Sequence, residues 1–448
     1  MGLTRDLCQI VHSTRYESLG AECVDRVKQV IMDGIAVALA GCKAPQVAIS
    51  VDHMRSLGGA PQAGVWGWAT RVSMLQAAYI NSAAMHLLDF EPMWKPSTHA
   101  LSPTVPVAFA LAETRPVTGK QIIATITKGL EIQGRLTYAA NIHTSEKMRF
   151  HPPGVVGVLG AAVVAAELLE LDVPAMQHAL GVAASRTGSL VANIGSMTKC
   201  THCAHAAASG FDAALLAKRG FTANPDVIEA PKGLAETFYP GTFEPEKLLG
   251  YGKPFRIVDP GFAIKLFPSQ YGTHWVITAG LELHRQIGDP SRIARVRIVS
   301  PVSKYIDRPN PADGLEGKHS LQYTTAAALL DGKVTIDTFL DERRFRSDIV
   351  ELLGKTEVVQ DASIPSSLSE MRVAIAVELR DGRRLTAECL GPKGVWGIPL
   401  EAGDHRAKLE DCFGRVLPDQ SVNEVLDLLE HLELQDVSGV RRIMSLIA

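Results

Sequence analysis

Residues 154–172 read GVVGVLGAAVVAAELLELD, and this stretch decides the fold class. Its small apolar side chains continue for several helical turns, and such side chains allow neighbouring helices to pack closely. A helix that is apolar on all sides is expected at the centre of a helical domain. The apolar run ends at Glu167, and it is shorter than the roughly 18 residues that indicate a membrane span. The stretch therefore predicts a mainly α fold.

Helical periodicity extends outward from this segment over most of residues 1–255. Residues 22–40 place Val27, Ile31 and Ile35 on one stripe, as an amphipathic helix does. Similar patterns predict helices over residues 72–88, 102–114, 119–138, 154–170, 174–190 and 203–219.

The pattern changes after about residue 260. Residues 294–300 (ARVRIVS) and 371–379 (MRVAIAVEL) are typical of strands because polar and apolar side chains alternate. The second run meets Asp381-Gly382 and resumes at residues 384–389, and an Asp-Gly pair between two such runs is a strong hairpin signal. Helical patterns lie between the strands, so this part predicts a small α+β domain. The helical patterns cover residues 271–286, 319–331 and 335–340.

The tail returns to helix and places Val425, Leu428, Leu429 and Leu432 on one face. We expect this face to pack back on the first helices. The predicted fold is mainly α, with a large all-helical domain built from both chain ends and a smaller α+β lid domain. The predicted boundaries are 1–258 and 398–448 for the helical domain, and 259–397 for the lid.

Composition limits the class of function. The chain has 448 residues and a net charge of −3, which argues against a general nucleic-acid binder because such a protein needs a basic face. The first twenty residues lack the apolar core of a signal peptide. Seven irregularly spaced cysteines, an odd number, indicate reduced thiols. We expect a cytoplasmic protein that binds neither membranes nor nucleic acid.

A polar loop interrupts the helices at residues 86–99, HLLDFEPMWKPSTH. It gathers carboxylates, a lysine and two histidines, and its two prolines stop the helix and stiffen the loop. A solvated connection between helices would also have this composition, so the loop alone leaves both interpretations open.

Two further polar segments lead into helices. Residues 148–154 (MRFHPPG) place His151 just before the small-residue helix, where free backbone N–H groups favour an anion. Residues 193–205 (NIGSMTKCTHCAH) place Lys199 in a loop that feeds the next helix, as a cradle for a carboxylate would.

The second segment also resembles a zinc site, because Cys200, His202, Cys203 and His205 follow one another closely. Structural zinc sites draw their ligands from two separated pairs, and four ligands within six consecutive residues do not readily converge on one ion. We therefore expect no metal there.

Five segments in this order resemble the MmgE/PrpD family. Together they span most of the chain, and the ordered set is far more specific than any single one. They are DFEPMWKPSTH (89–99), RFHPPGVVGVLGAA (149–162), GSMTKCTHCAHAAASG (195–210), KLFPSQYGTHWVITA (265–279) and HSLQYTTAAALLDG (319–332).

The resemblance implies a homodimer with a cleft between its domains, and a reaction on a small carboxylate without a metal or organic cofactor. Family activities include 2-methylcitrate dehydratase, cis-aconitate decarboxylase and iminodisuccinate epimerase, and the third segment is closer to the last two. Matching positions imply catalytic and substrate-binding residues. The catalytic set is Asp89, His99, His151 and Lys199, and the substrate-binding set is Met93, Lys265, Gln270 and Tyr305.

These residue types suit proton transfer at a carbon next to a carboxylate. Removing that proton creates an enolate-like anion, which Lys199 and Lys265 would stabilise. His99 and His151 can take and return protons near neutral pH. Asp89 would orient a histidine or lysine by accepting its hydrogen bond.

Three positions depart from the decarboxylases. Met93 stands in place of a threonine, Gln270 in place of another polar residue or a histidine, and Ala100 in place of a proline. Fewer carboxylate contacts favour an epimerase of an iminodisuccinate-like dicarboxylate, with His99 opposite Lys199 or His151. The alternatives are a lyase, either a 2-methylcitrate-type dehydratase or a cis-aconitate-type decarboxylase, and a non-catalytic scaffold.

Overall fold

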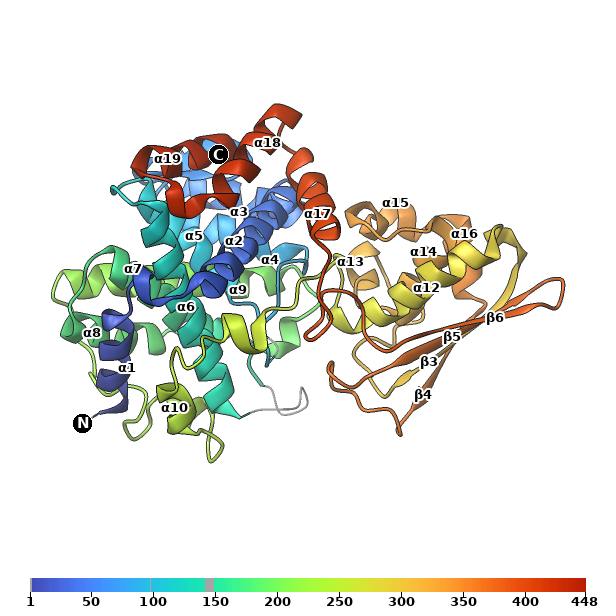
Figure 1. The fold of residues 1–448 in the computed structure, drawn as a ribbon, viewed down its shortest axis with the longest axis horizontal. Helices are drawn as coiled ribbons and strands as arrows, with labels where there is room; N and C mark the ends of the chain where they lie inside the picture. Colours follow the sequence, from blue (N-terminus) through green and yellow to red (C-terminus); the bar gives the residue numbers. More distant parts are fainter. Residues whose placement is uncertain (1, 97, 142–148) are drawn as a thin grey trace. The chain divides into compact units, whose positions relative to one another are not determined.

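The computed structural model describes residues 2–96, 98–141 and 149–448 (Figure 1). The chain divides into two compact units. The first contains Met1–Leu87, Glu91–Ile264 and His405–Ala448, and the second contains Leu88–Phe90 and Lys265–Asp404. Helices dominate the first unit and a sheet with helices forms the second, so the predicted mainly α fold is confirmed.

The small-residue segment forms α7 (Pro153–Leu168), in which every residue except Glu167 is buried. It packs most extensively against α9 (Thr198–Lys218) and also contacts α5 (Leu101–Ala112) and α6 (Gly119–Ala140). A Cβ added to Gly210 of α9 would lie 2.2 Å from the backbone oxygen of Val158. The missing side chain therefore allows the close helix contact that the sequence predicts.

The other helices of the first unit surround this centre. Seven precede residue 250: α1 (Leu3–Ser13), α2 (Ala21–Gly41), α3 (Pro45–Ser56), α4 (Met74–Leu87), α8 (Val173–Ala184), α10 (Leu234–Phe238) and α11 (Pro245–Leu249). Three come from the tail: α17 (Ala402–Gly414), α18 (Asp419–Glu430) and α19 (Val437–Ile447).

The tail is fixed to the first helices by buried charge. Asp33 of α2 is fully buried, and its carboxylate lies 3.0 Å from Nε2 of His405 and accepts a hydrogen bond of 2.8 Å from Nζ of Lys408. Apolar side chains of α18 also pack against α2. The tail therefore packs back on the N-terminal helices, as predicted, and both chain ends build this unit (Figure 1).

One element of the first unit was not predicted. Strands β1 (Ala63–Val65) and β2 (Trp68–Val72) form an antiparallel hairpin within the otherwise helical unit. Gly67 turns the chain with a φ of +70°, which favours glycine. The buried Asn81 side chain accepts from the backbone N–H of Trp66 and donates to the Gly64 carbonyl. The short strands carry too few alternating residues to be recognised in the sequence.

The second unit has a four-stranded sheet of order β4-β3-β5-β6. Strands β5 (Val373–Leu379) and β6 (Arg384–Cys389) pair antiparallel around the predicted Asp-Gly turn, where Gly382 has a φ of +85°. Strand β3 (Ile293–Pro301) pairs antiparallel with β5 and parallel with β4 (Thr356–Asp361). The hairpin and β3 confirm the sequence prediction, whereas β4 was not predicted.

Helices cover one face of this sheet (Figure 1). Helix α12 packs on β5 and β6, and α14 contacts both α12 and β4. The helices of this unit are α12 (His274–Ile287), α13 (Gly314–Gly317), α14 (Leu321–Asp331), α15 (Asp341–Arg344) and α16 (Ser347–Leu353).

Among the described residues, no single helix combines the length and hydropathy needed to cross a bilayer. Helices α2 and α3 meet this criterion only when they are taken together, and the chain bends by 86° between them.

Candidate active site

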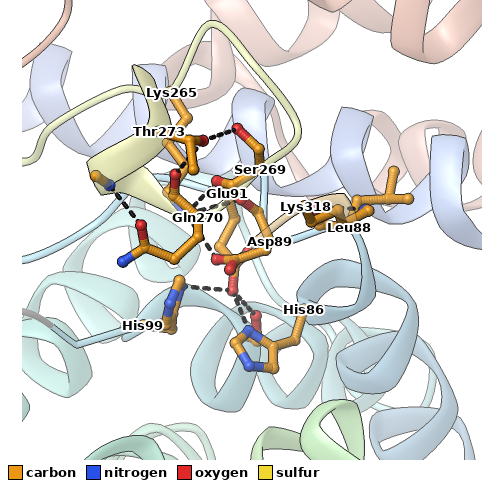
Figure 2. A network of polar contacts seen from close by, with 12 residues as sticks. His86, Leu88, Asp89, Glu91, His99, Lys265, Ser269, Gln270, Thr273 and Lys318 are labelled. Carbon is orange, nitrogen blue, oxygen red and sulfur yellow. Dashed lines mark hydrogen bonds and ion pairs between the residues drawn. The ribbon is translucent and has the colours of Figure 1, made fainter. Parts of the chain in front are cut away.

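The connection between α4 and α5 in the first unit surrounds one carboxylate with donors (Figure 2). His86 stands in the last turn of α4, Glu91 in the connection, and His99 just before α5. Oε1 of Glu91 lies 2.7 Å from Nδ1 of His86 and 3.1 Å from Nδ1 of His99. It also accepts a hydrogen bond of 2.9 Å from the hydroxyl of Ser102. We call His86, Glu91 and His99 the Glu91 cluster.

Two more histidines extend the Glu91 cluster. The ring centroids of His86 and His99 are 4.6 Å apart, and the His151 ring lies 5.6 Å from His86 and 6.2 Å from His99. Nδ1 of His151 is 3.2 Å from Nδ1 of His202 in α9. The backbone of His151 donates to the Ser189 carbonyl, which fixes it directly before α7. Four imidazoles thus lie in one buried group.

Burial and charge set the protonation of this group. Burial lowers the pKa of His86 to about 4, although Glu91 opposes that shift, and Lys199 adds to it. Burial, His86 and Lys199 lower the pKa of His151 well below its usual value. Burial alone would raise the pKa of Glu91, but His99 and His86 outweigh it and hold that pKa well below its usual value. The Glu91 cluster therefore holds an ionised carboxylate beside a neutral His86 at pH 7.

Lys199 lies in the first turn of α9 and is partly buried. Its positive charge lowers the pKa values of His86, His151 and His202, so it acts electrostatically on the histidine group. The structure thus brings together three of the predicted catalytic residues, namely His99, His151 and Lys199. Their catalytic role stays a prediction.

Asp89, the fourth predicted catalytic residue, belongs to the second unit. Lys265 is 1% exposed, and its Nζ donates to the Asp89 carboxylate at 2.6 Å and to the Asp89 carbonyl at 2.7 Å (Figure 2). Nζ of Lys318 donates to the Leu88 carbonyl at 3.0 Å. These lysines attach the short segment Leu88–Phe90 to its unit, and Asp89 accepts a hydrogen bond from a lysine, as expected.

The other predicted substrate-binding residues have neighbours of their own. Met93 is buried and exchanges backbone hydrogen bonds with Ala263. Gln270 uses its side-chain oxygen to accept from the backbone N–H of Gly272, at 2.6 Å. Tyr305 is 39% exposed and lies edge-on to His319. Whether these residues bind substrate stays a prediction.

Within the described part of the chain, the Glu91 cluster is the one group of three donors that could hold a metal, with ligand atoms within 4.8 Å of one another. Two ligand atoms on tetrahedral zinc, with bonds of about 2.0–2.1 Å, would lie about 3.3–3.4 Å apart. The 2.7 Å between His86 and Glu91 is instead a hydrogen-bond distance. In this structure His86 and Glu91 are therefore hydrogen-bonded to each other.

The four residues that resemble a zinc site do not converge in the structure. All four lie within α9, where Cys200 and Cys203 share one face and His202 and His205 share a roughly opposite face, so the two pairs point away from each other. Cys200 packs against Ala83 and Ala204, His202 contacts His151, and His205 contacts Ser209.

Sequence reasoning missed Glu91, His86 and His202 as members of the site. Glu91 and His86 belong to the quoted loop, and a second carboxylate beside two histidines was the available signal. His202 was considered only as a metal ligand, because its distance from His151 depends on how α7 and α9 pack.

The matches to known proteins together cover nearly the whole chain. The profile of the MmgE/PrpD N-terminal domain matches residues 5–246, and that of the MmgE/PrpD C-terminal domain matches residues 267–434. Human cis-aconitate decarboxylase is 30% identical over an alignment of 455 positions, which covers 99% of this chain and 94% of the human protein. The mouse cis-aconitate decarboxylase is 29% identical, covering 99% and 93%. A 2-methylcitrate dehydratase from Cupriavidus necator is 24% identical, covering 89% and 88%.

These relatives correct one expectation. The main prediction of an epimerase, and so of an isomerase, is wrong, because the relatives are named as decarboxylases and a dehydratase, which are lyases. The prediction depended on Met93, Gln270 and Ala100. Gln270 caps a turn, and the Ala100 carbonyl accepts hydrogen bonds from Gln133 and Thr104. These positions serve local structure and are a poor guide to the reaction.

Proposed function

Because the chain belongs to the MmgE/PrpD family, we propose that it is a carboxy-lyase that removes CO₂ from a cis-aconitate-like tricarboxylate. The observation that carries this proposal is the buried group of histidines around Glu91, under the charge of Lys199. Similarity to cis-aconitate decarboxylases over 99% of the chain supports the choice of reaction.

The proposed reaction needs a cation and one proton. The bond between the saturated carbon of the substrate and its carboxylate breaks, and CO₂ leaves. The electron pair forms a new double bond, and the pair of the old double bond moves to the carbon next to a remaining carboxylate. That carbon takes a proton, so the products are CO₂ and a methylidene dicarboxylate. The enzyme must therefore stabilise a carbanion and then protonate it.

Residues of the first unit match both requirements. Lys199 supplies a positive charge that can stabilise the developing anion. His99 and His151 are the proposed proton carriers, because an imidazole can both accept and donate a proton. A buried imidazole whose pKa is lowered, as in His151, is a strong acid once it is protonated. The roles of Lys265 and Asp89, which bond to each other in the second unit, stay predictions.

A dehydratase is the second candidate, because the 2-methylcitrate dehydratase relative also covers most of the chain. In that reaction a base removes the proton next to a carboxylate, and an acid protonates the departing hydroxyl group. The same histidines can supply both steps.

Product analysis separates the two lyases. The purified enzyme is incubated with cis-aconitate, 2-methylcitrate or citrate, with and without a chelator, and proton NMR and CO₂ release are recorded. We expect CO₂ and a methylidene signal from cis-aconitate, unaffected by the chelator. An alkene formed from 2-methylcitrate without CO₂ would replace the decarboxylase with the dehydratase. Loss of activity in chelator would contradict the predicted absence of a metal.

The proposed assembly is a homodimer. Light scattering coupled to size-exclusion chromatography tests it, and a monomeric mass of 48.2 kDa would contradict it.

A further inference from the structure

A hydrogen bond joins His151, one of the two proposed proton carriers, to a second histidine, His202. Their Nδ1 atoms lie 3.2 Å apart, and their ring centroids lie 5.3 Å apart. Both side chains are buried, since His151 is 6% exposed and His202 is 5% exposed. Within the described part of the chain, this is the one hydrogen bond of the His151 ring, so it fixes which edge of that ring faces His202.

The packing of the helices holds the two rings together. His151 lies directly before α7, and its backbone N–H donates to the Ser189 carbonyl at 2.8 Å. His202 lies near the start of α9, the helix that packs most extensively against α7. Because the backbone is fixed on both sides, the two rings are in place before a substrate binds.

An imidazole pair that is joined through two Nδ1 atoms needs one donor and one acceptor. One Nδ1 therefore carries a proton and the other does not. A protonated imidazole carries a proton on both nitrogens, so a protonated His151 must donate from Nδ1 and His202 must accept. The second N–H of His151, on Nε2 at the other edge of the ring, is then the one that can be given to a substrate.

The surroundings allow the pair one extra proton. Burial lowers the pKa of His202, and Lys199 and His205 add to that shift. Burial also lowers the pKa of His151, and His86, Lys199 and any charge on His202 add to it, so the two rings are not both charged. One buried imidazolium needs an acceptor, because an unpaired buried charge is costly. A neutral His202 supplies that acceptor.

We propose that His202 is a positioning residue, which accepts the Nδ1–H of protonated His151 and directs the Nε2–H of His151 towards the substrate. The transfer of that proton to a carbanion rests on the proposed function. In this step the Nε2–H bond breaks, its electron pair stays on Nε2, and the proton forms a new C–H bond. His151 is then neutral and still donates to His202 through Nδ1, and water returns a proton to Nε2. His202 does not contact the reacting carbon.

The first test detects the pair in the wild-type protein. Histidine is labelled with ¹⁵N, and the protonation of each Nδ1 and the ¹⁵N–¹⁵N coupling across the hydrogen bond are recorded, with His202→Leu to assign the signals. We expect a proton on one of the two Nδ1 atoms and a coupling to the other. Two Nδ1 atoms that both lack a proton, or that show no coupling, would overturn the proposal, whatever substrate the enzyme uses.

The second test compares two substitutions of His202 with cis-aconitate as the substrate. Leucine keeps most of the side-chain volume but cannot accept a hydrogen bond, whereas asparagine can place an oxygen close to the position of Nδ1. In His202→Leu we expect kcat to fall about 10- to 100-fold, the effect of losing a hydrogen bond to a charged group, with KM changed less than about threefold. His202→Asn should restore kcat to within about threefold of the wild type.

A matched control is His205→Gln. His205 lies one turn further along the same face of α9, but it is exposed and contacts Ser209. Its kcat and KM should be those of the wild type. Wild-type kcat in folded His202→Leu, or an equal loss in His202→Asn, would overturn the proposal. The expected hydrogen bond between His151 and His202, in an enzyme that decarboxylates none of the acids, would instead refute the proposed function alone.

Discussion

Asp33 and Glu91 are both buried carboxylates that contact histidine in the first unit, but their surroundings differ. Asp33 has a lysine and a histidine on its two oxygens and links the tail to α2. Glu91 has two histidines and a hydroxyl on one oxygen, and its Oε2 has no hydrogen-bond partner among the described residues. Buried polar groups are normally satisfied, so an incompletely satisfied carboxylate beside residues with perturbed pKa values is a candidate for a functional role.

Burial of a charge alone therefore does not identify a functional site. The Asp33 link joins two segments far apart in the sequence, so its removal should affect folding. The Glu91 cluster comes from one short stretch of the chain, between the last turn of α4 and the start of α5, so its residues add little to the connection between distant segments. We therefore expect substitutions at the two carboxylates to affect different properties.

The largest effect is expected from His99→Asn. This change removes the proposed proton carrier but keeps a side chain that can donate to Glu91. We expect kcat/KM to fall about 10²–10⁴-fold, and the melting temperature to stay within a few degrees of the wild type. Steady-state kinetics and thermal unfolding measure the two. Full activity in this variant would place the chemistry elsewhere.

Lys199→Met should come next, because it removes a charge but retains most of the side-chain volume. We expect an activity loss of about 10²–10³-fold, with the free energy of unfolding changed by less than about 1 kcal/mol. Removing this charge should also raise the pKa values of His86 and His151, which NMR titration can follow. A variant that fails to fold would show that Lys199 is structural.

Asp33→Asn should give the converse result. Removing one partner of a buried ion pair takes the Asp33 charge away from Lys408, and the expected loss is about 3 kcal/mol in the free energy of unfolding. Denaturant unfolding measures this loss, and kcat of the folded fraction should be unchanged. A large fall in kcat would remove the distinction between the two carboxylates.

The smallest effect is expected in the pH dependence of the free energy of unfolding. The pKa of His86 is about 4 in the folded protein and about 6.5 when unfolded, so the unfolded chain binds the proton more tightly. The contribution of neutral His86 to stability is then fully present above about pH 6.5 and is lost as pH falls towards 4. The free energy of unfolding should fall by about 2 kcal/mol between pH 7 and pH 5. Urea unfolding at several pH values measures it. In His86→Gln this part of the slope should disappear, and an unchanged slope would contradict the assignment.

Much of the fold could be predicted because local patterns determine it. The apolar stretch that became α7 and the Asp-Gly turn between β5 and β6 carry strong signals over few residues. Strand β4 carries a weaker pattern, since most of its residues are only half-buried. The hairpin of β1 and β2 depends on the distant Asn81, which no local pattern reveals.

The candidate site was predictable in part. His99, His151 and Lys199 stand in recognisable segments, and the structure brings them to one group. Glu91 was not predicted, because Asp89, two residues earlier, was interpreted as the carboxylate that orients a histidine or lysine. In the structure Asp89 pairs with Lys265. The choice of reaction failed because single substitutions such as Gln270 can serve a turn as well as a substrate.

In the proposed reaction, the histidine group protonates the carbanion that is formed by loss of CO₂. The most direct measurement is NMR of the product formed from cis-aconitate in D₂O. We predict one deuterium on the carbon next to the remaining carboxylate in each molecule of methylidene dicarboxylate, with one CO₂ released and no deuterium in unreacted substrate. Deuterium entering the substrate without release of CO₂ would contradict the account.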